Sequence, residues 1–365
     1  STTLAGNTAV VGTGTWSVIS GDNGSFVDAN SPTTIFNGDA GETYVLRWRI
    51  TNGVCTPSDD EVTIRFDQTP SAAVAGSDID QCNNGTFTLN ATNPAIGTGK
   101  WTVTSGTATI TNDNSFNTRV TGVPVGTSAT LRWTVSNGSC ASNTDDVILN
   151  NRNNPTATLS GTDNTICSGE SVTFTAGGGS NYEFFVSGVS VQNGASNTYA
   201  TSALLNGQIV TVRVTNGFGC SAVSAGITMT VNPTPVASIL SNDADNSICA
   251  ASSITFTATP SGASQYDFRV DGVVVQATAS NVFTTTALAD NDVVDVIITS
   301  AAGCVGTSAG ITVNVDAAPT VSNAGPDQLA LCGVTSTTLT GNTAVVGTGT
   351  WSVISGDNGS FVDAN

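Results

Sequence analysis

The eight cysteines are the residues of this chain whose type and spacing most clearly allow chemistry. Three pairs lie at closely similar separations along the sequence: Cys82 with Cys140, Cys167 with Cys220, and Cys249 with Cys304. Recurring pairs of this kind indicate disulfides formed in an oxidising, extracellular setting. Closing loops of this length stabilises a small domain by roughly 4 kcal/mol when only chain entropy is considered. The sequence therefore predicts one disulfide inside each of three successive segments.

The two remaining cysteines, Cys55 and Cys332, are explained by a long repeat. Residues 6–30 recur letter for letter at 341–365, an offset of 335 residues. Moved forward by 335, Cys55 would follow Cys332 at the same separation at which Cys140 follows Cys82. We expect both to be half-bridges to neighbouring repeats. Zinc binding by paired thiols is disfavoured, because the chain has no CxxC motif and no His.

Clustered oxygen ligands make calcium the metal ion to consider, and no other cofactor is expected. Calcium takes six to eight oxygens from carboxylates, amides and carbonyls. The candidate ligands, best at the loop 242–246, are Asp243, Asp245, Asn246, Asp290 and Asp292. They do not follow the spacing of an EF-hand loop. The alternative is that these side chains cap turns and remain hydrated.

Catalysis is not expected from the residue types present. Without His, neither a Ser-His-Asp nor a Cys-His site can form, and no nucleophile elbow or phosphate loop occurs. Carboxylates at 59–61 and 145–146 are a conceivable glycosidase pair. They recur at corresponding places just before a predicted last strand, which favours a turn or strand-entry role.

The charge and the hydropathy of the chain exclude two kinds of partner. Nine Lys and Arg residues against 27 Asp and Glu give a net charge of −18. Nucleic acid is not an expected partner, since phosphate binding needs clustered cations. No apolar run reaches the length of about 18 residues that a membrane helix needs, so we expect no direct membrane insertion.

Prolines mark a shorter period inside the long repeat. Pro70, Pro155, Pro235 and Pro319 follow one another at nearly equal intervals, which divides the 335-residue unit into four domains. The first two share the motif GTG-x-W, and the third and fourth lack Trp. The predicted domains are an N-terminally truncated A-type domain at 1–68, an A-type domain at 69–152, B-type domains at 153–232 and 233–316, and the start of another A-type domain at 317–365.

Each predicted domain shows the two-residue periodicity of β-strands. Apolar residues alternate with Thr and Ser in about seven short segments, and turn-forming Asn, Asp and Gly residues separate them. This pattern predicts an all-β chain, a tandem array of immunoglobulin-like antiparallel β-sandwiches that forms an extended rod. Alternation also places Trp16, Trp48, Trp101 and Trp133 on an inward face, which favours core packing over an exposed sugar-binding platform.

Several segments carry a resemblance to a known class of repeats. GTGTWSVISG, YVLRWRITNGVC and SICAASSITFTATPSGASQYDFRVDGVVVQ resemble the PKD-like, immunoglobulin-like tandem repeats of giant secreted surface adhesins of Bacteroidetes-type bacteria. The resemblance covers essentially the whole chain. It implies export by the type IX secretion route, an extracellular cell-surface location associated with the outer membrane through other parts, and a role in adhesion that includes gliding-motility adhesins.

Three hypotheses about function follow. The first is a non-catalytic 335-residue structural repeat of an extracellular stalk, fibre or adhesin, whose partners are neighbouring copies of the repeat. The second is a module that binds surface polysaccharide or other cells, which exposed coplanar aromatic side chains would favour. The third is a filament assembled head-to-tail by strand donation, in which residues 317–335 complete the first domain of another chain.

Overall fold

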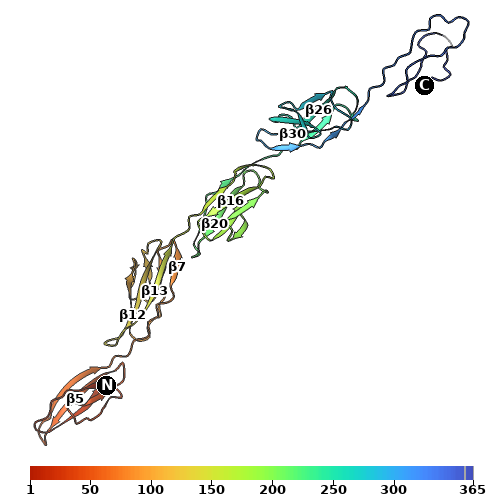
Figure 1. The fold of residues 1–365 in the computed structure, drawn as a ribbon. Coiled ribbons are helices and arrows are strands. Elements are labelled where there is room, and N and C mark those ends of the chain that lie inside the picture. The colour runs from red at the N-terminus through yellow and green to blue at the C-terminus, as the bar shows by residue number, and fades with distance from the viewer. Residues whose placement is uncertain (357–358, 365) are drawn as a thin grey trace. The chain divides into compact units, whose positions relative to one another are not determined.

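The computed structural model describes residues 1–356 and 359–364 and contains thirty-three strands, β1 to β33, with no helix among those residues (Figure 1). Within the described part, no helix is long and apolar enough to cross a membrane. Most strand pairs are antiparallel, and the strands fall into four sandwiches of two or more sheets. The predicted all-β class is confirmed.

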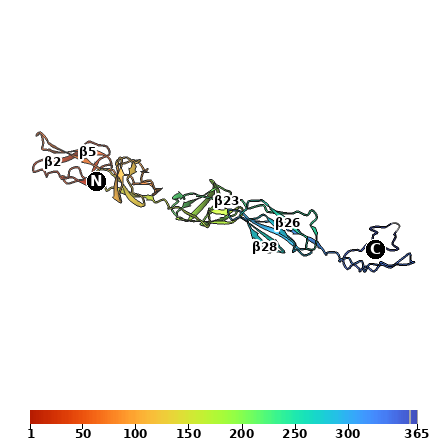
Figure 2. The same ribbon diagram turned by 90° about the horizontal axis from the view of Figure 1, so that it is seen from above.

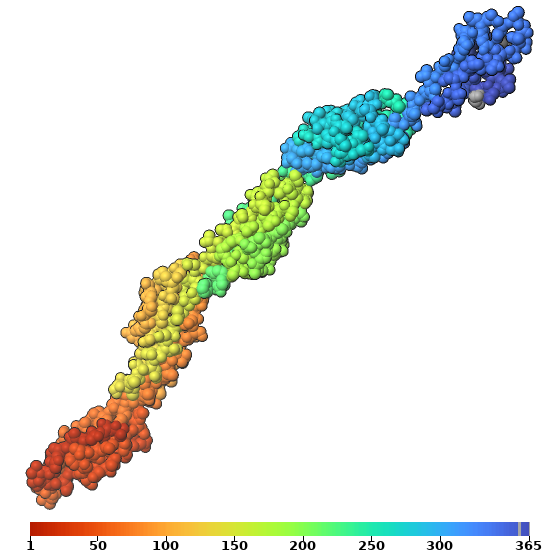
Figure 3. Space-filling view, in the orientation of Figure 1, coloured from red at the N-terminus to blue at the C-terminus, as the bar shows by residue number. Residues whose placement is uncertain are grey.

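The first sandwich is built from two three-stranded sheets, β2-β5-β6 and β1-β4-β3. Its long strands β2 and β5 lie side by side (Figure 2) and pair antiparallel, and the register places Trp16 opposite Trp48. Figure 3 shows its atoms, red to orange, packed into one body. The strand bounds are β1 Thr2–Thr3, β2 Thr13–Ser20, β3 Ser25–Phe26, β4 Ile35–Asn37, β5 Thr43–Thr51 and β6 Ser58–Arg65.

The second sandwich repeats this plan and adds one strand. Its sheets are β7-β13-β12-β9 and β10-β11-β8. The added strand, β7, runs parallel to β13 and covers its outer edge. The bounds are β7 Ile79–Cys82, β8 Phe87–Thr88, β9 Thr98–Ser105, β10 Thr109–Ile110, β11 Arg119–Thr121, β12 Thr127–Ser136 and β13 Asn143–Arg152.

The third sandwich contains the sheets β14-β16-β19, β15-β23 and β18-β17-β20-β21, with β22 on β20. Here β15 and β23 form a parallel pair. The bounds are β14 Thr158–Gly161, β15 Thr165–Cys167, β16 Val172–Gly177, β17 Asn181–Val186, β18 Val189–Gly194, β19 Thr198–Thr201, β20 Ile209–Thr215, β21 Ser221–Val223, β22 Ile227–Thr228 and β23 Thr230–Asn232.

The fourth sandwich has the same strand order, with sheets β24-β26-β29, β25-β33 and β28-β27-β30-β31, and with β32 on β30. Again the pair that ends the sandwich, β25 with β33, is parallel. The bounds are β24 Ser238–Ser241, β25 Ser247–Cys249, β26 Ile254–Thr259, β27 Gln265–Val270, β28 Val273–Thr278, β29 Val282–Thr285, β30 Val293–Thr299, β31 Val305–Thr307, β32 Ile311–Thr312 and β33 Asn314–Asp316.

Contact density divides the chain into two compact units, and the division passes through the third sandwich. One unit comprises Ser1–Ser160, Thr175–Thr198 and Thr211–Gly226, and the other comprises Gly161–Phe174, Tyr199–Val210 and Ile227–Asn365. Every disulfide and joint described below lies within one unit. The boundaries of the five predicted domains stay predictions, and residues 357, 358 and 365 of the last one lie outside the described residues.

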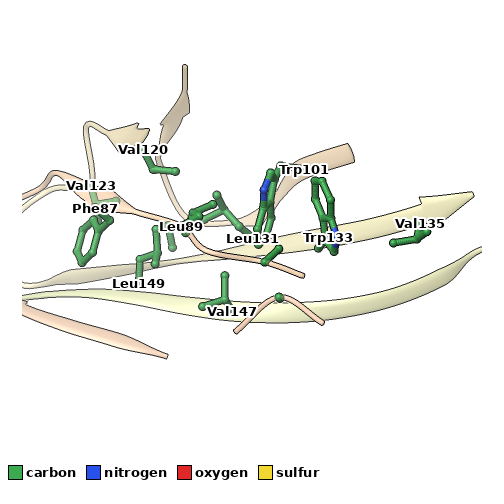
Figure 4. Packing of buried hydrophobic residues seen from close by; sticks show 13 residues of the cluster. Phe87, Leu89, Trp101, Val120, Val123, Leu131, Trp133, Val135, Val147 and Leu149 are labelled. Atoms are coloured by element: carbon green, nitrogen blue, oxygen red, sulfur yellow. The ribbon is translucent and has the colours of Figure 1, made fainter. Parts of the chain in front are cut away.

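The core of each sandwich follows from alternation along the strands. In β12, Ala129, Leu131, Trp133 and Val135 are buried while the residues between them are not, because successive side chains of a strand point to opposite faces (Figure 4). The predicted burial of Trp16, Trp48, Trp101 and Trp133 is confirmed, since all four are at most 6% exposed. They therefore do not form an exposed sugar-binding platform.

The motif GTG-x-W has a packing reason that the sequence alone did not supply. Trp101 and Trp133 face each other across β9 and β12 with ring centroids 5.0 Å apart. The ring of Trp133 lies over Gly99, two residues before Trp101, so that a Cβ atom at Gly99 would overlap it. Trp48 covers Gly14 of the first sandwich in the same way. The second glycine of the motif therefore leaves the space that the Trp ring of the neighbouring strand occupies.

Residues 317–364 contain no assigned strand among those that the structure describes, although 341–364 repeat 6–29. In the first copy, residues 13–20 form β2 because they pair with β5. Among the described residues no strand pairs with 348–355. An isolated strand has nowhere to place its backbone hydrogen bonds, so the same residues remain irregular.

Candidate functional site: the cysteine joints

Two disulfides form, and each joins one sandwich to the next. Cys82 of the second sandwich bonds Cys220 of the third, with Cα atoms 5.4 Å apart and 138 residues between them in sequence. Cys167 of the third bonds Cys304 of the fourth, with Cα atoms 5.6 Å apart and a sequence separation of 137. The disulfides are therefore connections between neighbours along the chain.

The predicted pairing within each sandwich is wrong. Cys82 lies opposite Arg152 at the last residue of β13, whereas Cys140 follows β12 and precedes Asn143, where β13 begins. The strand from Asn143 to Arg152 spans roughly 30 Å. A disulfide needs Cα atoms within about 4.4–6.8 Å of each other. The two cysteines are at opposite ends of one sandwich, so they cannot bond.

The other two predicted pairs fail as well. Cys167 and Cys220 are both bonded, but to other partners, and Cys249 is free while Cys304 is bonded to Cys167. Free thiols remain at Cys55, Cys140, Cys249 and Cys332, of which Cys140 is half-buried and the others are exposed. That Cys55 and Cys332 are half-bridges to neighbouring repeats stays a prediction.

Three cysteines share one structural position, and we call them the exit cysteines. Each is the last residue of a short strand that runs parallel to the final strand of its own sandwich. Each lies directly opposite the residue where the chain leaves that sandwich. The opposed pairs are Cys82 with Arg152, Cys167 with Asn232, and Cys249 with Asp316.

The remaining cysteines of the four sandwiches, which we call the arrival cysteines, follow the central long strand: Cys55, Cys140, Cys220 and Cys304. Two of them lie against the segment that leads into their own sandwich. The Cys140 thiol donates to the Asp67 carbonyl at 3.5 Å, and Cys304 Sγ lies 3.8 Å from the Asn232 carbonyl oxygen. An exit cysteine of one sandwich and an arrival cysteine of the next therefore meet at the same joint.

The joint between the second and third sandwiches has noncovalent contacts beside its disulfide. The Arg152 guanidinium lies over the Phe218 ring, 4.3 Å from its centroid, and Arg152 Nε is 2.7 Å from a carboxylate oxygen of Asp80. Asn216 Nδ2 donates to the Asn153 carbonyl at 3.1 Å. The contact of Arg152 with Phe218 and the hydrogen bond from Asn216 thus cross this joint beside the disulfide, and Asp80 holds Arg152 in place within the second sandwich.

The joint between the first and second sandwiches has no disulfide among the described residues and is held by hydrogen bonds. The Ser139 backbone N–H donates to Asp67 Oδ2 at 2.6 Å, and Asn137 Nδ2 donates to the Gln68 carbonyl at 2.7 Å. The hydrogen bonds from Ser139, first that of its backbone N–H, and then the nearby Arg65 hold the pKa of Asp67 below its ordinary value of 3.8. The ionised carboxylate is the form that holds this joint.

We predict that acid weakens this joint through Asp67. A carboxyl whose pKa is lowered by folding adds stability above its unfolded pKa, and that contribution is lost as the pH falls through the folded value. The Ser139 amide chemical shift should therefore titrate with a midpoint below 3.8. In the Asp67→Asn variant that titration should disappear. A midpoint at or above 3.8 would contradict the assignment.

The proposed calcium ligands occupy two loops on either side of β33. Asn246 accepts the Asn314 N–H through its backbone carbonyl, and Asp290 Oδ1 accepts the Val315 N–H at 3.0 Å. Asp292 Oδ2 accepts the Ala289 N–H at 2.8 Å. No group of three or more acidic, His or Cys side chains suited to a metal forms among the described residues. Asp292 therefore caps its own turn, and Asp290 binds the backbone of β33.

The loop 242–246 is the part of this set where two carboxylates do meet. A hydrogen bond with Asp243, and next the Ser247 N–H, hold the pKa of Asp245 below its ordinary value. Ser241 Oγ donates to Asn246 Oδ1 at 2.6 Å. Calcium binding here stays a prediction: titration calorimetry should detect one calcium ion, lost in Asp245→Asn and kept in Asp292→Asn. Binding retained in Asp245→Asn would remove this loop as the site.

The carboxylate runs considered as a glycosidase pair are bound in cross-strand ion pairs. The sequence predicted that they precede the last strand of each sandwich, and this is wrong, because they lie within β6 and β13. Arg49 pairs with Asp59 at 2.7 Å and Arg132 with Asp146 at 2.7 Å, and each Arg holds the pKa of its partner below the ordinary value. A glycosidase acid needs a raised pKa, and the lowered pKa of Asp59 and Asp146 is the opposite of that property.

Comparison with known proteins gives matches in structure only. No family model matches the chain, and no curated protein matches it. A three-domain immunoglobulin segment of titin, I67–I69, is similar at 13% identity and TM-score 0.39, covering 69% of this chain and 99% of that one. A Ca²⁺-stabilised adhesin with which an Antarctic bacterium reaches out and binds ice is similar at 15% identity and TM-score 0.31, with coverages of 84% and 91%. The fibronectin(III)-like modules of Clostridium thermocellum CbhA are similar at 15% identity and TM-score 0.28, with coverages of 43% and 95%. At these identities and TM-scores none of them assigns a function.

Proposed function

We propose that this chain is a non-catalytic structural repeat of an extracellular surface protein, which spaces or carries an adhesive activity. The observation that carries the proposal is the pair of disulfides that join successive sandwiches, Cys82–Cys220 and Cys167–Cys304. A binding module needs each sandwich to be stable. Covalent bonds from the second sandwich to the third and from the third to the fourth serve instead to keep consecutive units together.

The disulfides also support an extracellular location. Structural disulfides persist in oxidising compartments and are rare where thiols are kept reduced. The excess of acidic residues would keep neighbouring copies soluble beside one another. Attachment to a bacterial outer membrane, export by the type IX route and a part in gliding motility belong to the proposal through the resemblance of the repeats.

Electron microscopy of the native material from the cell surface tests this function. A compact domain of about 84 residues spans roughly 30–40 Å, so a 335-residue unit of four should give an axial repeat of about 140 Å. Thin filaments with that repeat are the expected result. Isolated particles one unit long would overturn the proposal and favour a discrete binding protein.

Strand donation remains a second candidate because of the outer edge of β6. In the second sandwich the matching strand, β13, pairs with β12 and β7, whereas β6 pairs only with β5 among the described residues. An exposed strand edge is a template for pairing with another chain. Sedimentation of the reduced chain separates the two candidates, since donation predicts concentration-dependent oligomers without disulfides.

A further inference from the structure

Four cysteines form no disulfide, and three of them stand at the positions of cysteines in the other sandwiches: Cys249 at an exit position, and Cys55 and Cys140 at arrival positions. We propose that Cys249 and Cys332 bond Cys55 and Cys140 of the next copy of this chain, so that every sandwich of an array is linked to its neighbour. This inference deepens the proposed function by naming the partner, a second copy, and the atoms that join it.

Cys249 is an exit cysteine in every structural respect. It ends β25 opposite Asp316, where the chain leaves the fourth sandwich, as Cys167 ends β15 opposite Asn232. Cys167 is bonded to the arrival cysteine of the following sandwich. Cys249 is exposed and has no such partner within the chain. Its partner must come from a sandwich that follows the fourth.

Cys332 corresponds to Cys82, as the backbone of its segment shows. The Ser71 N–H bonds the Ile96 carbonyl at the start of the second sandwich, and the Thr320 N–H bonds the Val346 carbonyl in the last segment. Gly76 and Gly325 both have a positive φ, +94° and +80°. The last segment thus begins as the second sandwich does, and we assign Cys332 the exit position that Cys82 has there.

The arrival positions needed by these two cysteines are present at the other end of the chain. Cys55 and Cys140 lie in turns of the same kind. The backbone N–H of each donates, at a distance of 3.1 Å, to the carbonyl of an Asn three residues earlier, Asn52 for Cys55 and Asn137 for Cys140. Both thiols are unbonded. The order of the repeat places a copy of Cys55 in the sandwich after Cys249, and a copy of Cys140 in the sandwich after Cys332.

The chemistry is ordinary thiol–disulfide exchange. A thiolate attacks one sulfur of an oxidised disulfide such as glutathione disulfide and releases one glutathione thiolate, and the second cysteine then displaces the other. Each new bond removes two protons and two electrons from the cysteine pair and reduces one glutathione disulfide to two thiols. The protein disulfide is retained because folding holds the two cysteines side by side.

A doubled chain tests the inference with a count. Residues 1–335 followed by residues 1–365 contain sixteen cysteines, and they are refolded with reduced and oxidised glutathione. The single chain should show four thiols that react with Ellman's reagent. The doubled chain should also show four, because two new bonds form at the junction. Eight reactive thiols would overturn the proposal.

Variants and peptide mapping assign the count to named bonds. Cys55→Ser in the second copy alone should raise the count from four to five and leave Cys249 of the first copy reactive, while Cys55→Ser in the first copy should lower it to three. Mapping should link Cys249 to the second copy's Cys55. Bonds from Cys249 to Cys304 would overturn it. These results do not depend on where the protein acts, so the filament images can fail while the thiol count succeeds, and the reverse.

Discussion

Under force, the oxidised chain between Cys82 and Cys304 is expected to extend only about a quarter as far as the reduced chain. The two disulfides interlock, because Cys167 lies inside the loop that Cys82–Cys220 closes and Cys304 lies outside it. The shortest covalent path passes from Cys82 to Cys220, back along the chain to Cys167, and on to Cys304. That path contains only the segment between positions 167 and 220, whereas the backbone path contains everything between positions 82 and 304.

Optical-tweezers stretching with handles at the two ends measures this difference. A fully extended chain spans about 3.4 Å per residue, which gives about 180 Å for the oxidised path and about 750 Å for the reduced one. Adding a reductant should therefore lengthen the stretched molecule by about 570 Å. This shorter covalent path would protect a structural repeat, since it limits the length of chain that is released when the second, third or fourth sandwich unfolds.

Single cysteine variants show which bonds limit the extension. Cys249→Ser should leave the oxidised length unchanged, because Cys249 is free in this chain. Disulfides within each sandwich would shorten the whole molecule by a similar total, but then Cys249→Ser would release the segment up to Cys304, about 190 Å when extended. Lengthening of Cys249→Ser would therefore contradict the joints described here.

Replacing Gly99 by Ala is expected to destabilise the second sandwich by about 3 kcal/mol. A Cβ atom at Gly99 would overlap the Trp133 ring, which is 1% exposed and packs against Trp101, so the ring has no free volume to move into. Overpacking of a dense core forces side chains off their rotamers or shifts the backbone. Hydrogen exchange of peptides from β9 and β12 in urea should report the loss.

Two controls assign the effect to the overlap with Trp133. Gly217→Ala should be neutral, because a Cβ there meets nothing within 4 Å. Placing Gly99→Ala in a Trp133→Phe background should reduce the penalty, since the smaller ring leaves room, and the double-mutant cycle measures that coupling. A penalty unchanged in the Phe background would mean that another contact causes it.

The sequence by itself determined which segments favour strands and which of their faces turn inward. Alternation of apolar residues with Thr and Ser is a local property, and it correctly predicted strands such as β5 and β12 and the burial of Trp48 and Trp133. It worked because a half-buried strand needs that alternation whichever strand lies beside it. The motif GTG-x-W was visible too, but its reason was not, since the covering ring comes from another strand.

Only the tertiary structure decided the partners of the cysteines. In a repeat, pairing Cys82 with Cys140 or with Cys220 leaves the same regular pattern of spacings, so periodicity cannot distinguish a bond within a sandwich from one between neighbours. The fold decides, because it places exit and arrival cysteines of one sandwich roughly 30 Å apart and those of neighbouring sandwiches within 5.6 Å.

The repeated segment shows the same division most directly. Residues 13–20 and 348–355 have one sequence, yet the first forms β2 and the second forms no strand. The sequence supplies strand propensity and an apolar face, and both copies have these equally. A strand also needs a neighbouring strand to accept and donate its backbone hydrogen bonds. Among the described residues, 13–20 have that neighbour in β5, and 348–355 have none.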